Sequence, residues 1–489
     1  MKYGKQHIQH QSVMRGIFLI PRLMRSNIMK TLKLADIVKV VNGQMIQGNA
    51  EFEISKVAKL IKNISEYSIY FHMNKKSISP DSLMGKTNYT IVTENIDILT
   101  MVDKSVSVIL VADGKKSYYQ FIEYYRNLFS IPVIGVTGTC GKTTTKDMIK
   151  HILKQYLQVH STMLSQNGLH LNLHYLMGIN EKTEAAVFEM GVAYPGNIKS
   201  SGKYFKPTIG IITNIGEAHL EGCKTLEKYI RAKGELLEVL PENGTLIINA
   251  DDTNIKRLPT GLFKGCVLSF GQHENADFKA TNIRYEDDRM EYTLHVNRTL
   301  YEVVIPGYGE HNVYNSLAAI AAASLIGISI QDAITRLKTF KTMERHVKLY
   351  NSKGISVIDD TWSCNPSSVV SAIEVLKKIS NGKKEVLVLG KMQRLGSQLK
   401  NQHIKMGETI MNYGEVDHLI TIGPSAKLTG EKAISLGMDP SKVHSVVNAL
   451  QLESKLAEIS TEEMVILFKM SLGKMDPAYR RVIEKYRFS

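Results

Sequence analysis

Two hydrophobic patterns alternate along most of this chain. Short apolar runs rich in β-branched residues predict buried strands, and stretches with an apolar residue every three or four positions predict amphipathic helices. The expected strands are 89–93, 107–112, 131–136, 185–189, 209–213, 245–249, 355–359, 385–390, 418–422 and 464–468. Helical periodicity separates them, most clearly at 116–129 and 224–240. This alternation implies an α/β fold with mainly parallel sheets covered on both faces.

The same patterns divide the chain into parts. A chain of 489 residues is too long for one core. Residues 1–28 lack a regular pattern, and we expect a disordered extension or a true start at Met29 rather than a membrane anchor. We expect a small α/β domain at 29–130, a second domain at 131–338 with a β-rich insertion, and a doubly wound third domain at 339–489.

One strand-to-helix junction carries the most informative motif. The expected strand at 131–136 runs into Thr137-Gly-Thr-Cys-Gly-Lys-Thr-Thr144, and helical periodicity follows. Glycines let backbone N–H groups point at one oxyanion, and a helix N-terminus adds partial positive charge. Although the loop is shorter than a standard P-loop, we expect Lys142 to reach terminal phosphates and Thr143 to bind Mg²⁺. The alternative is an ordinary turn with a surface lysine, which this strand–helix context disfavours.

Polar residues follow the next two expected strands as well. Glu189 ends one strand, and Asn214 and His219 follow the other. Ligands of parallel sheets bind at the carboxyl ends of the strands. We therefore expect Glu189 to bind Mg²⁺ opposite Thr143, and His219 to be a second metal ligand. The alternatives are a salt-bridged glutamate and a hydrogen-bonded loop histidine.

Three further polar residues lie near the expected boundary of the last two domains. Asn315 begins an Ala-rich helix and offers an amide to a purine edge, unless it only caps the helix. Arg345 lies near the boundary, and Asp360 ends the first strand of the third domain. We expect these two residues to close a nucleotide from the far side, which places the site in an inter-domain cleft.

Composition excludes several classes of protein. The net charge is +14, but the basic residues form no long block, so we interpret it as a solvated surface that attracts anionic nucleotides rather than nucleic acid. The four cysteines are scattered without a C-x-x-C pair, which favours a reducing cytoplasm over disulfides or zinc. No apolar run approaches the roughly 18 residues of a membrane span. We expect a cytoplasmic monomer with no nucleic-acid or membrane partner.

Taken in chain order, these segments resemble the Mur ligase family over roughly residues 105–475. The matching segments are 137–144, 189–191 with 195–196, 213–221, 232–233, 249–252, 309–315, 359–360 with 365–366, 388–390, 395–396 and His403. The resemblance implies three domains: a substrate-nucleotide domain, a central P-loop ATPase and a Rossmann-like acceptor domain. It also implies that ATP activates a carboxylate as an acyl phosphate, which an amine attacks to give an amide, ADP and phosphate.

The resemblance assigns roles residue by residue. It implies ATP and Mg²⁺ as cofactors, with a carboxylate such as a UDP-linked muramoyl peptide and an amine such as a dipeptide or amino acid as substrates. The catalytic residues would be Lys142, His219 and Lys233. Of these, Lys233 matches a lysine that is carbamoylated in the family. The metal ligands would be Thr143, Glu189 and His219. The ATP contacts would be Thr137, Gly138, Thr139, Cys140, Gly141, Lys142, Thr143, Thr144, Asn315, Arg345 and Asp360.

The departures from the family pattern lie on the substrate side. Family Asn-Asn-x-Ile-Gly-x-Pro aligns with 166–172, which makes Asn167 a substrate candidate. Family Gly-Asp-Met-x-Glu-Leu-Gly aligns with 390–396, where Lys391 and Arg394 replace two acids and suit a more anionic acceptor. Three alternatives stay open. They are the family's cell-wall ligation of a dipeptide, a divergent paralogue joining another acid and amine, and a non-catalytic nucleotide-binding protein, which the retained phosphate and metal groups disfavour.

Overall fold

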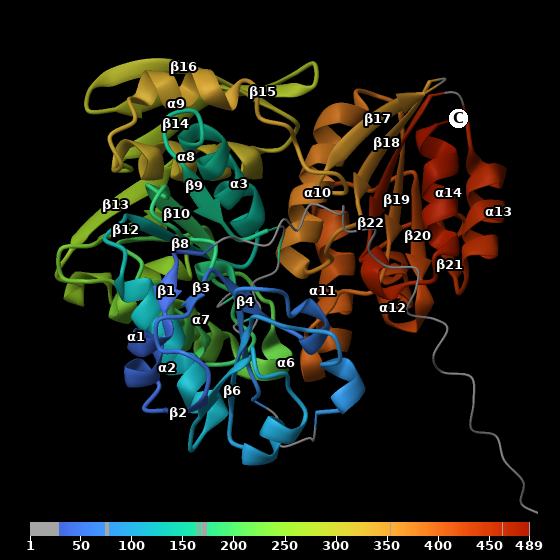
Figure 1. Ribbon diagram of the computed structural model, residues 1–489. Coiled ribbons are helices and arrows are strands. Elements are labelled where there is room, and N and C mark those ends of the chain that lie inside the picture. Colours follow the sequence, from blue (N-terminus) through green and yellow to red (C-terminus); the bar gives the residue numbers. More distant parts are fainter. Residues whose placement is uncertain are drawn as a thin grey trace, which may run out of the picture. The chain divides into compact units, whose positions relative to one another are not determined.

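The structure is a computed structural model that describes residues 29–73, 78–163, 165, 168, 174–352, 354–461 and 463–488. It divides between Phe121 and Ile122 into two compact units (Figure 1). The expected boundaries at 29, 131 and 339 stay predictions. The α/β fold with parallel sheets is confirmed, because three sheets of mainly parallel strands are wrapped by helices.

The first unit is a small α/β domain. Its five-stranded sheet has the order β2-β7-β6-β5-β4, and β4 to β7 are parallel. The elements are β1 (Leu32–Lys33), α1 (Leu34–Val40), β2 (Gln44–Gln47), β3 (Glu53–Ile54), β4 (Lys56–Ala58), β5 (Ser68–Phe71), β6 (Thr90–Thr93), β7 (Ser107–Leu110) and α2 (Gly114–Asn127), which crosses the boundary. The strands expected at 89–93 and 107–112 are confirmed as β6 and β7.

The second unit begins with a nine-stranded sheet of order β16-β15-β14-β13-β12-β11-β8-β10-β9. Its strands are β8 (Val133–Thr137), β9 (Val159–Ser161), β10 (Ala185–Glu189), β11 (Ile209–Ile212), β12 (Thr245–Asn249), β13 (Cys266–Gly271), β14 (Phe278–Glu286), β15 (Arg289–Val296) and β16 (Thr299–Pro306). The expected β-rich stretch is present as β13 to β16. These strands extend the sheet of the phosphate-loop strand β8.

Helices cover both faces of this sheet. One face packs against α3 (Lys142–Leu153), α8 (Glu310–Ser324) and α9 (Ile330–Leu337) in one apolar core. The opposite face packs against α7 (Leu226–Val239), because Gly210 of β11 lies against Leu236. Two shorter helices, α5 (Asn197–Phe205) and α6 (Leu220–Cys223), precede α7. The strands are therefore buried on both sides, which explains their continuous apolar runs.

A second sheet of order β17-β18-β22-β19-β20-β21 completes this unit. Five strands are parallel, and β17 is an antiparallel edge. The strands are β17 (Lys348–Ser352), β18 (Ile355–Asp360), β19 (Lys384–Leu389), β20 (His418–Ile422), β21 (Val443–Val446) and β22 (Met464–Lys469). The helices are α10 (Pro366–Ser380), α11 (Leu399–Asn412), α12 (Gly423–Ser435), α13 (Ala449–Ile459) and α14 (Ala478–Arg487).

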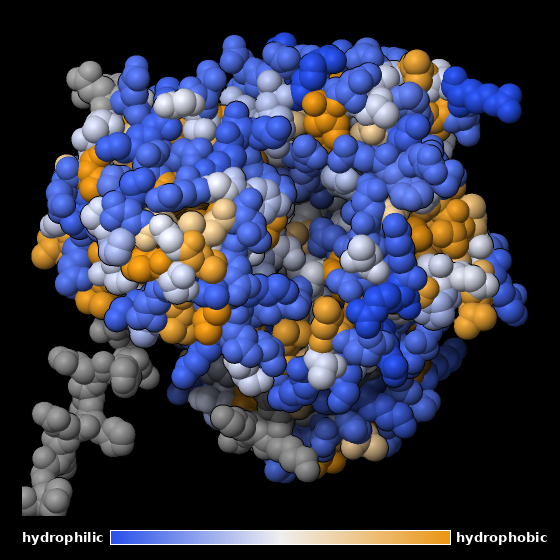
Figure 2. Space-filling view, turned by 180° about the vertical axis from the view of Figure 1, so that it is seen from behind, coloured by the Kyte–Doolittle hydropathy of each residue, from blue (hydrophilic) through white to orange (hydrophobic). Residues whose placement is uncertain are grey.

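The face of the molecule seen in Figure 2 is mostly polar. Charged and polar side chains cover most of this face, and apolar side chains occur there in small separate groups. Within the described part of the chain, no helix is both long and apolar enough to cross a bilayer.

Candidate active site

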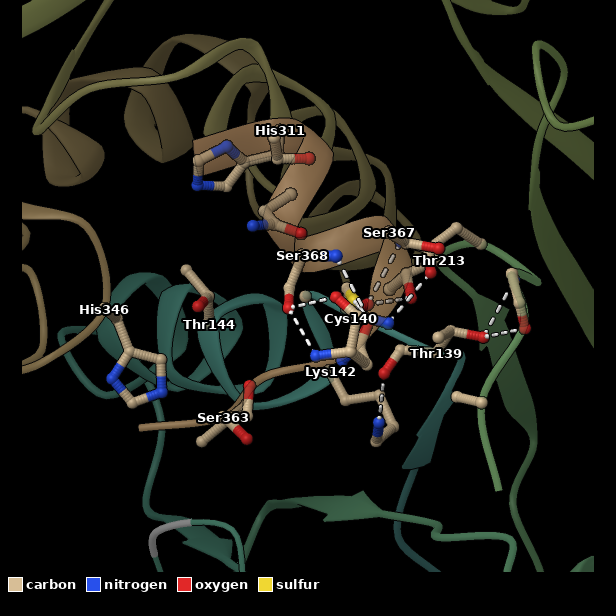
Figure 3. A pocket seen from close by; sticks show the side chains of 18 of the residues that line it. Thr139, Cys140, Lys142, Thr144, Thr213, His311, His346, Ser363, Ser367 and Ser368 are labelled. Carbon is tan, nitrogen blue, oxygen red and sulfur yellow. Dashed lines mark hydrogen bonds between the residues drawn. The ribbon is translucent and has the colours of Figure 1, made fainter. Parts of the chain in front are cut away.

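A cavity of about 1020 Å³ lies between the two sheets of the second unit (Figure 3). One wall is formed by the phosphate loop and by residues at the carboxyl ends of β10 and β11, and the other by residues at the carboxyl ends of β18 and β22. Carboxyl ends of parallel strands thus meet at one space, as expected for a ligand site in an α/β fold. Both sheets belong to the second unit, and the expected inter-domain position of the site stays a prediction.

The phosphate loop is built by two glycines and one asparagine. Gly138 and Gly141 have φ angles of 145° and 79°, which favour glycine. A Cβ on Gly138 would lie 1.9 Å from Thr213 Oγ1. Asn214 holds the part of the loop between the two glycines. Its side-chain Oδ1 accepts from the Cys140 N–H at 2.8 Å, and its backbone carbonyl accepts from the Thr139 N–H at 2.8 Å. These bonds and the two glycines therefore define the curved shape of the loop.

Lys142 folds back over this loop. Its Nζ donates to the Gly138 and Thr139 carbonyls, both at 2.9 Å, and it lines the cavity (Figure 3). These two neutral acceptors are weak partners for an ammonium group compared with phosphate oxygens. The long side chain can exchange them for an anion that enters the loop.

Thr143 and Glu189 meet, as the sequence predicts. The Thr143 hydroxyl donates to Glu189 Oε2 at 2.8 Å, and the Glu189 N–H donates to Thr162 Oγ1 at 3.1 Å. A hydroxyl and a carboxylate are hard oxygen donors that fit Mg²⁺. Among the described residues, no three His, Cys, Asp or Glu side chains group as a metal site. An ion at Thr143 and Glu189 would therefore take most of its other ligands from phosphates and water.

His219 lies at the junction of the two sheets. Its ring stacks on Tyr229 with a centroid distance of 6.2 Å, and its Nε2 lies 3.5 Å from Arg394 Nη1. Burial, together with the charges of Lys142, Arg394 and Lys233, lowers the pKa of His219 to about 3. The imidazole is thus neutral at pH 7, and its Nε2 accepts from Arg394, a contact that it would have to give up to bind a metal. Its role as a metal ligand stays a prediction.

Lys233 is buried beneath the phosphate loop. Its Nζ donates to Thr137 Oγ1 at 3.0 Å and to the Gly138 carbonyl at 2.8 Å. Burial and the nearby Lys142 charge lower the pKa of Lys233 well below its ordinary value. A deprotonated amine is nucleophilic, which is the state that carbamoylation by CO₂ requires.

The remaining ATP candidates occupy both walls. Asn315 accepts from Thr145 Oγ1 at 3.1 Å and lies directly under Gly141. Asp360 accepts from the buried Lys469 Nζ at 2.5 Å and lines the cavity. Arg345 instead donates to the Thr361 hydroxyl at 3.1 Å and to the Thr361 carbonyl at 2.6 Å. A direct contact between Arg345 and ATP stays a prediction.

The substrate candidates differ in their positions. Arg394 lines the cavity beside His219, whereas Lys391 is exposed on the same loop. Asn167 lies outside the described residues. Sequence reasoning missed Lys469 and His346 as site residues, although both line the cavity. Lys469 could have been noticed because it is a lysine at the end of a fully buried apolar strand. The sequence gives no comparable indication for His346.

His403 holds the loop that carries Arg394. It is fully buried in α11, its Nε2 accepts from the Met392 N–H at 3.2 Å, and its Nδ1 donates to Thr429 Oγ1 at 3.0 Å. These bonds define a neutral ring. Burial and the Lys391 charge lower the pKa of His403 to about 4.

Acid is therefore expected to destabilise the fold partly through His403. Below an unfolded pKa of about 6.5 the unfolded chain binds a proton that the folded chain does not, so stability is lost as pH falls toward 4. His403→Gln should reduce the loss in unfolding free energy between pH 7 and pH 5 by about 2 kcal/mol. Urea unfolding of the wild type and the variant at pH 7 and pH 5 measures the loss of unfolding free energy in each protein. Equal losses in the two proteins would contradict the assignment.

Comparison with known proteins agrees with this geometry. A phosphate loop at the cleft between two parallel-sheet domains defines a P-loop nucleotide-binding protein. Residues 136–323 match the Mur ligase middle domain, and residues 343–471 match the Mur ligase glutamate ligase domain. The UDP-N-acetylmuramoyl-tripeptide--D-alanyl-D-alanine ligase of Bacillus subtilis is 30% identical over 382 residues, which cover 77% of this chain and 81% of that protein. The chain belongs to the Mur ligase family.

Other relatives extend the similarity. The ligase of the same name from Escherichia coli is 25% identical over 91% of this chain and 96% of its own length. Among solved structures, MurF from Acinetobacter baumannii superposes with a TM-score of 0.81 at 23% identity, over 93% of this chain and 99% of that one. The Thermotoga maritima MurF ligase in complex with ADP superposes with a TM-score of 0.75 at 22% identity, over 88% of this chain and 97% of that one. These two structures show the shared fold.

Proposed function

We propose that this chain is an ATP-dependent ligase that joins the carboxylate of UDP-N-acetylmuramoyl tripeptide to the amino group of D-alanyl-D-alanine. The observation that carries the proposal is one cavity lined by Lys142 and the Thr143–Glu189 pair, with the buried Lys233 bonded to the phosphate loop from beneath. A chain that had lost catalysis would have no reason to keep all of them. The names of the relatives supply the two substrates, and we infer a monomer in the cytoplasm.

The chemistry follows from the charges around the cavity. The triphosphate lies along the phosphate loop, and Lys142 leaves the Gly138 and Thr139 carbonyls to contact it. The substrate carboxylate attacks the γ-phosphorus and displaces ADP, which gives an acyl phosphate. The amine then attacks the acyl carbon and expels phosphate. Both reactants of the first step are anions, so cations at the cavity, Lys142 and Arg394, lower their repulsion.

Lys233 and the metal complete the site. The neutral Lys233 amine adds CO₂ and loses a proton, which converts the side chain into a carbamate anion under the loop. Held by Thr143 and Glu189, Mg²⁺ would neutralise phosphate charge. No side-chain nucleophile is needed, because the carboxylate of the substrate is the attacking group.

A second candidate is ligation of a different acid and amine. It is favoured by Arg394 at the cavity and by Lys391 on the same loop, two positions where the family has acids. Cationic side chains here suit an acceptor with more negative charge than a dipeptide. If Lys391→Asp combined with Arg394→Glu leaves the choice of acceptor unchanged, this candidate loses its support.

One incubation separates the two candidates. The purified protein is given Mg²⁺-ATP with the tripeptide precursor, D-alanyl-D-alanine, or both, and Lys142→Ala is the blank. ADP release only with both substrates, and a pentapeptide product by mass, support the cell-wall reaction. No turnover from a protein that still binds ATP favours the second candidate.

A further inference from the structure

The C-terminal end of helix α14 is joined to a strained turn beside the cavity. Arg487, the last residue of α14, donates through Nη1 to Asp359 Oδ2 and through Nη2 to Glu344 Oε2, both at 3.2 Å. Nη2 also donates to Tyr350 Oη at 2.5 Å. The Arg487 side chain is 15% exposed and the Asp359 side chain is 2% exposed. A forked guanidinium thus joins the end of α14 to the 344–359 stretch, which lies at least 128 residues earlier in the chain.

The connected segments continue to the cavity wall. Asp359 Oδ1 accepts from Thr361 Oγ1 at 2.6 Å, and Thr361 accepts the two hydrogen bonds from Arg345. The Trp362 N–H donates to the Arg345 carbonyl at 3.0 Å. His346, the next residue after Arg345, stacks its ring on Trp362 with a centroid distance of 5.3 Å. His346 and Trp362 both line the cavity, and Figure 3 shows His346 projecting into it.

The turn at 345–347 needs such support. Arg345 and Val347 have φ angles of 68° and 53°, which are unfavourable for side chains of this size. Such a conformation persists only where surrounding contacts fix it. Arg487 supplies contacts on both sides of the turn, through Glu344 before it and Asp359 after it. Neither Arg487 nor Asp359 lines the cavity, so they act on it through the turn and through Thr361, whose neighbour Trp362 lines it.

We propose that Arg487 is a positioning residue for nucleotide binding, because it holds the 344–347 turn and thereby sets the His346–Trp362 wall of the cavity. The inference rests on the proposed nucleotide site and adds the C-terminal helix to the parts that shape it. Fixing a wall in its binding conformation raises affinity by lowering the ordering cost of binding. The effect should appear in nucleotide affinity and not in affinity for the amine.

The test uses Arg487→Met in the full-length protein, with Mg²⁺-ADP as the probe. Trp362 is the only tryptophan of the chain, so its fluorescence reports the wall directly. We expect the Kd for Mg²⁺-ADP to rise about tenfold, KM for ATP to rise in parallel, and KM for the amine to stay within about twofold. The Trp362 emission should also shift to the red. Arg481→Met, an exposed arginine on the same helix, is the matched control.

A second variant keeps the test informative if Arg487→Met fails to fold. Glu344 is 64% exposed, and Glu344→Gln removes one of the two ionic contacts at the surface. We expect the Kd for ADP to rise about two- to threefold. Unchanged ADP affinity and emission in the variants that fold would overturn the proposal. A wild-type protein that does not bind ADP would instead contradict the proposed function, which keeps the two failures distinct.

Discussion

Lys142→Met is expected to lower kcat about 10³-fold while the protein stays folded. The ammonium group is the cation that the phosphate loop directs at the transferred phosphoryl group, and methionine keeps its length without the charge. Among the described residues Lys142 bonds loop carbonyls and forms no ion pair, so its removal leaves no described carboxylate unpaired. The steady-state rate of ADP release measures kcat, and thermal unfolding of the variant checks that it is folded.

Lys154→Met is the matched control for that experiment. Lys154 is exposed just after the end of α3, the helix that begins with Lys142. It should keep kcat within about twofold. A Lys142→Met protein that retains a tenth or more of wild-type turnover would show that the loop lysine does not stabilise the transferred phosphate.

Lys233→Met should cause a loss of similar size, about 10³-fold, for a different reason. Burial and the nearby Lys142 charge lower the pKa of the Lys233 amine, which favours the neutral form that can add CO₂ and become an anion under the loop. Methionine cannot form a carbamate. With ¹³C-bicarbonate, we expect one carbamate resonance in the wild-type protein and none in the variant, and depleting CO₂ should lower wild-type turnover reversibly.

The control is Lys228→Met, an exposed lysine on the same helix as Lys233. It should retain the carbamate resonance and the turnover of the wild type. A wild-type protein that is fully active yet shows no carbamate after exhaustive labelling would remove this role from Lys233, and the buried amine would then be a structural donor to Thr137 and Gly138.

Local patterns predicted the parts of the fold and site that depend on neighbouring residues. β8 and β10 to β12 were predicted because strands buried on both faces are continuously apolar. The edge strands β9, β17 and β21 were not predicted, since each mixes polar and apolar residues. The meeting of Thr143 and Glu189 followed from strand ends that share an edge.

Contacts between distant segments were beyond sequence reasoning. The Lys469–Asp360 pair exists because β22 lies beside β18, an order that no local pattern gives. For the same reason the contacts of Arg345 with Thr361, and of Arg487 with Asp359 and Glu344, could not be foreseen. Position along the chain suggested that Arg345 faces a nucleotide, whereas its guanidinium here bonds the backbone of its own domain.

The central claim is that this cavity transfers a phosphoryl group to a carboxylate. It is tested most directly by supplying the tripeptide precursor with ¹⁸O in the carboxylate that is joined, together with Mg²⁺-ATP and D-alanyl-D-alanine. An acyl phosphate intermediate predicts that each turnover moves one ¹⁸O atom into the released phosphate and leaves one in the new amide. Product formation with unlabelled phosphate, or ATP hydrolysis without an amide product, would contradict the account.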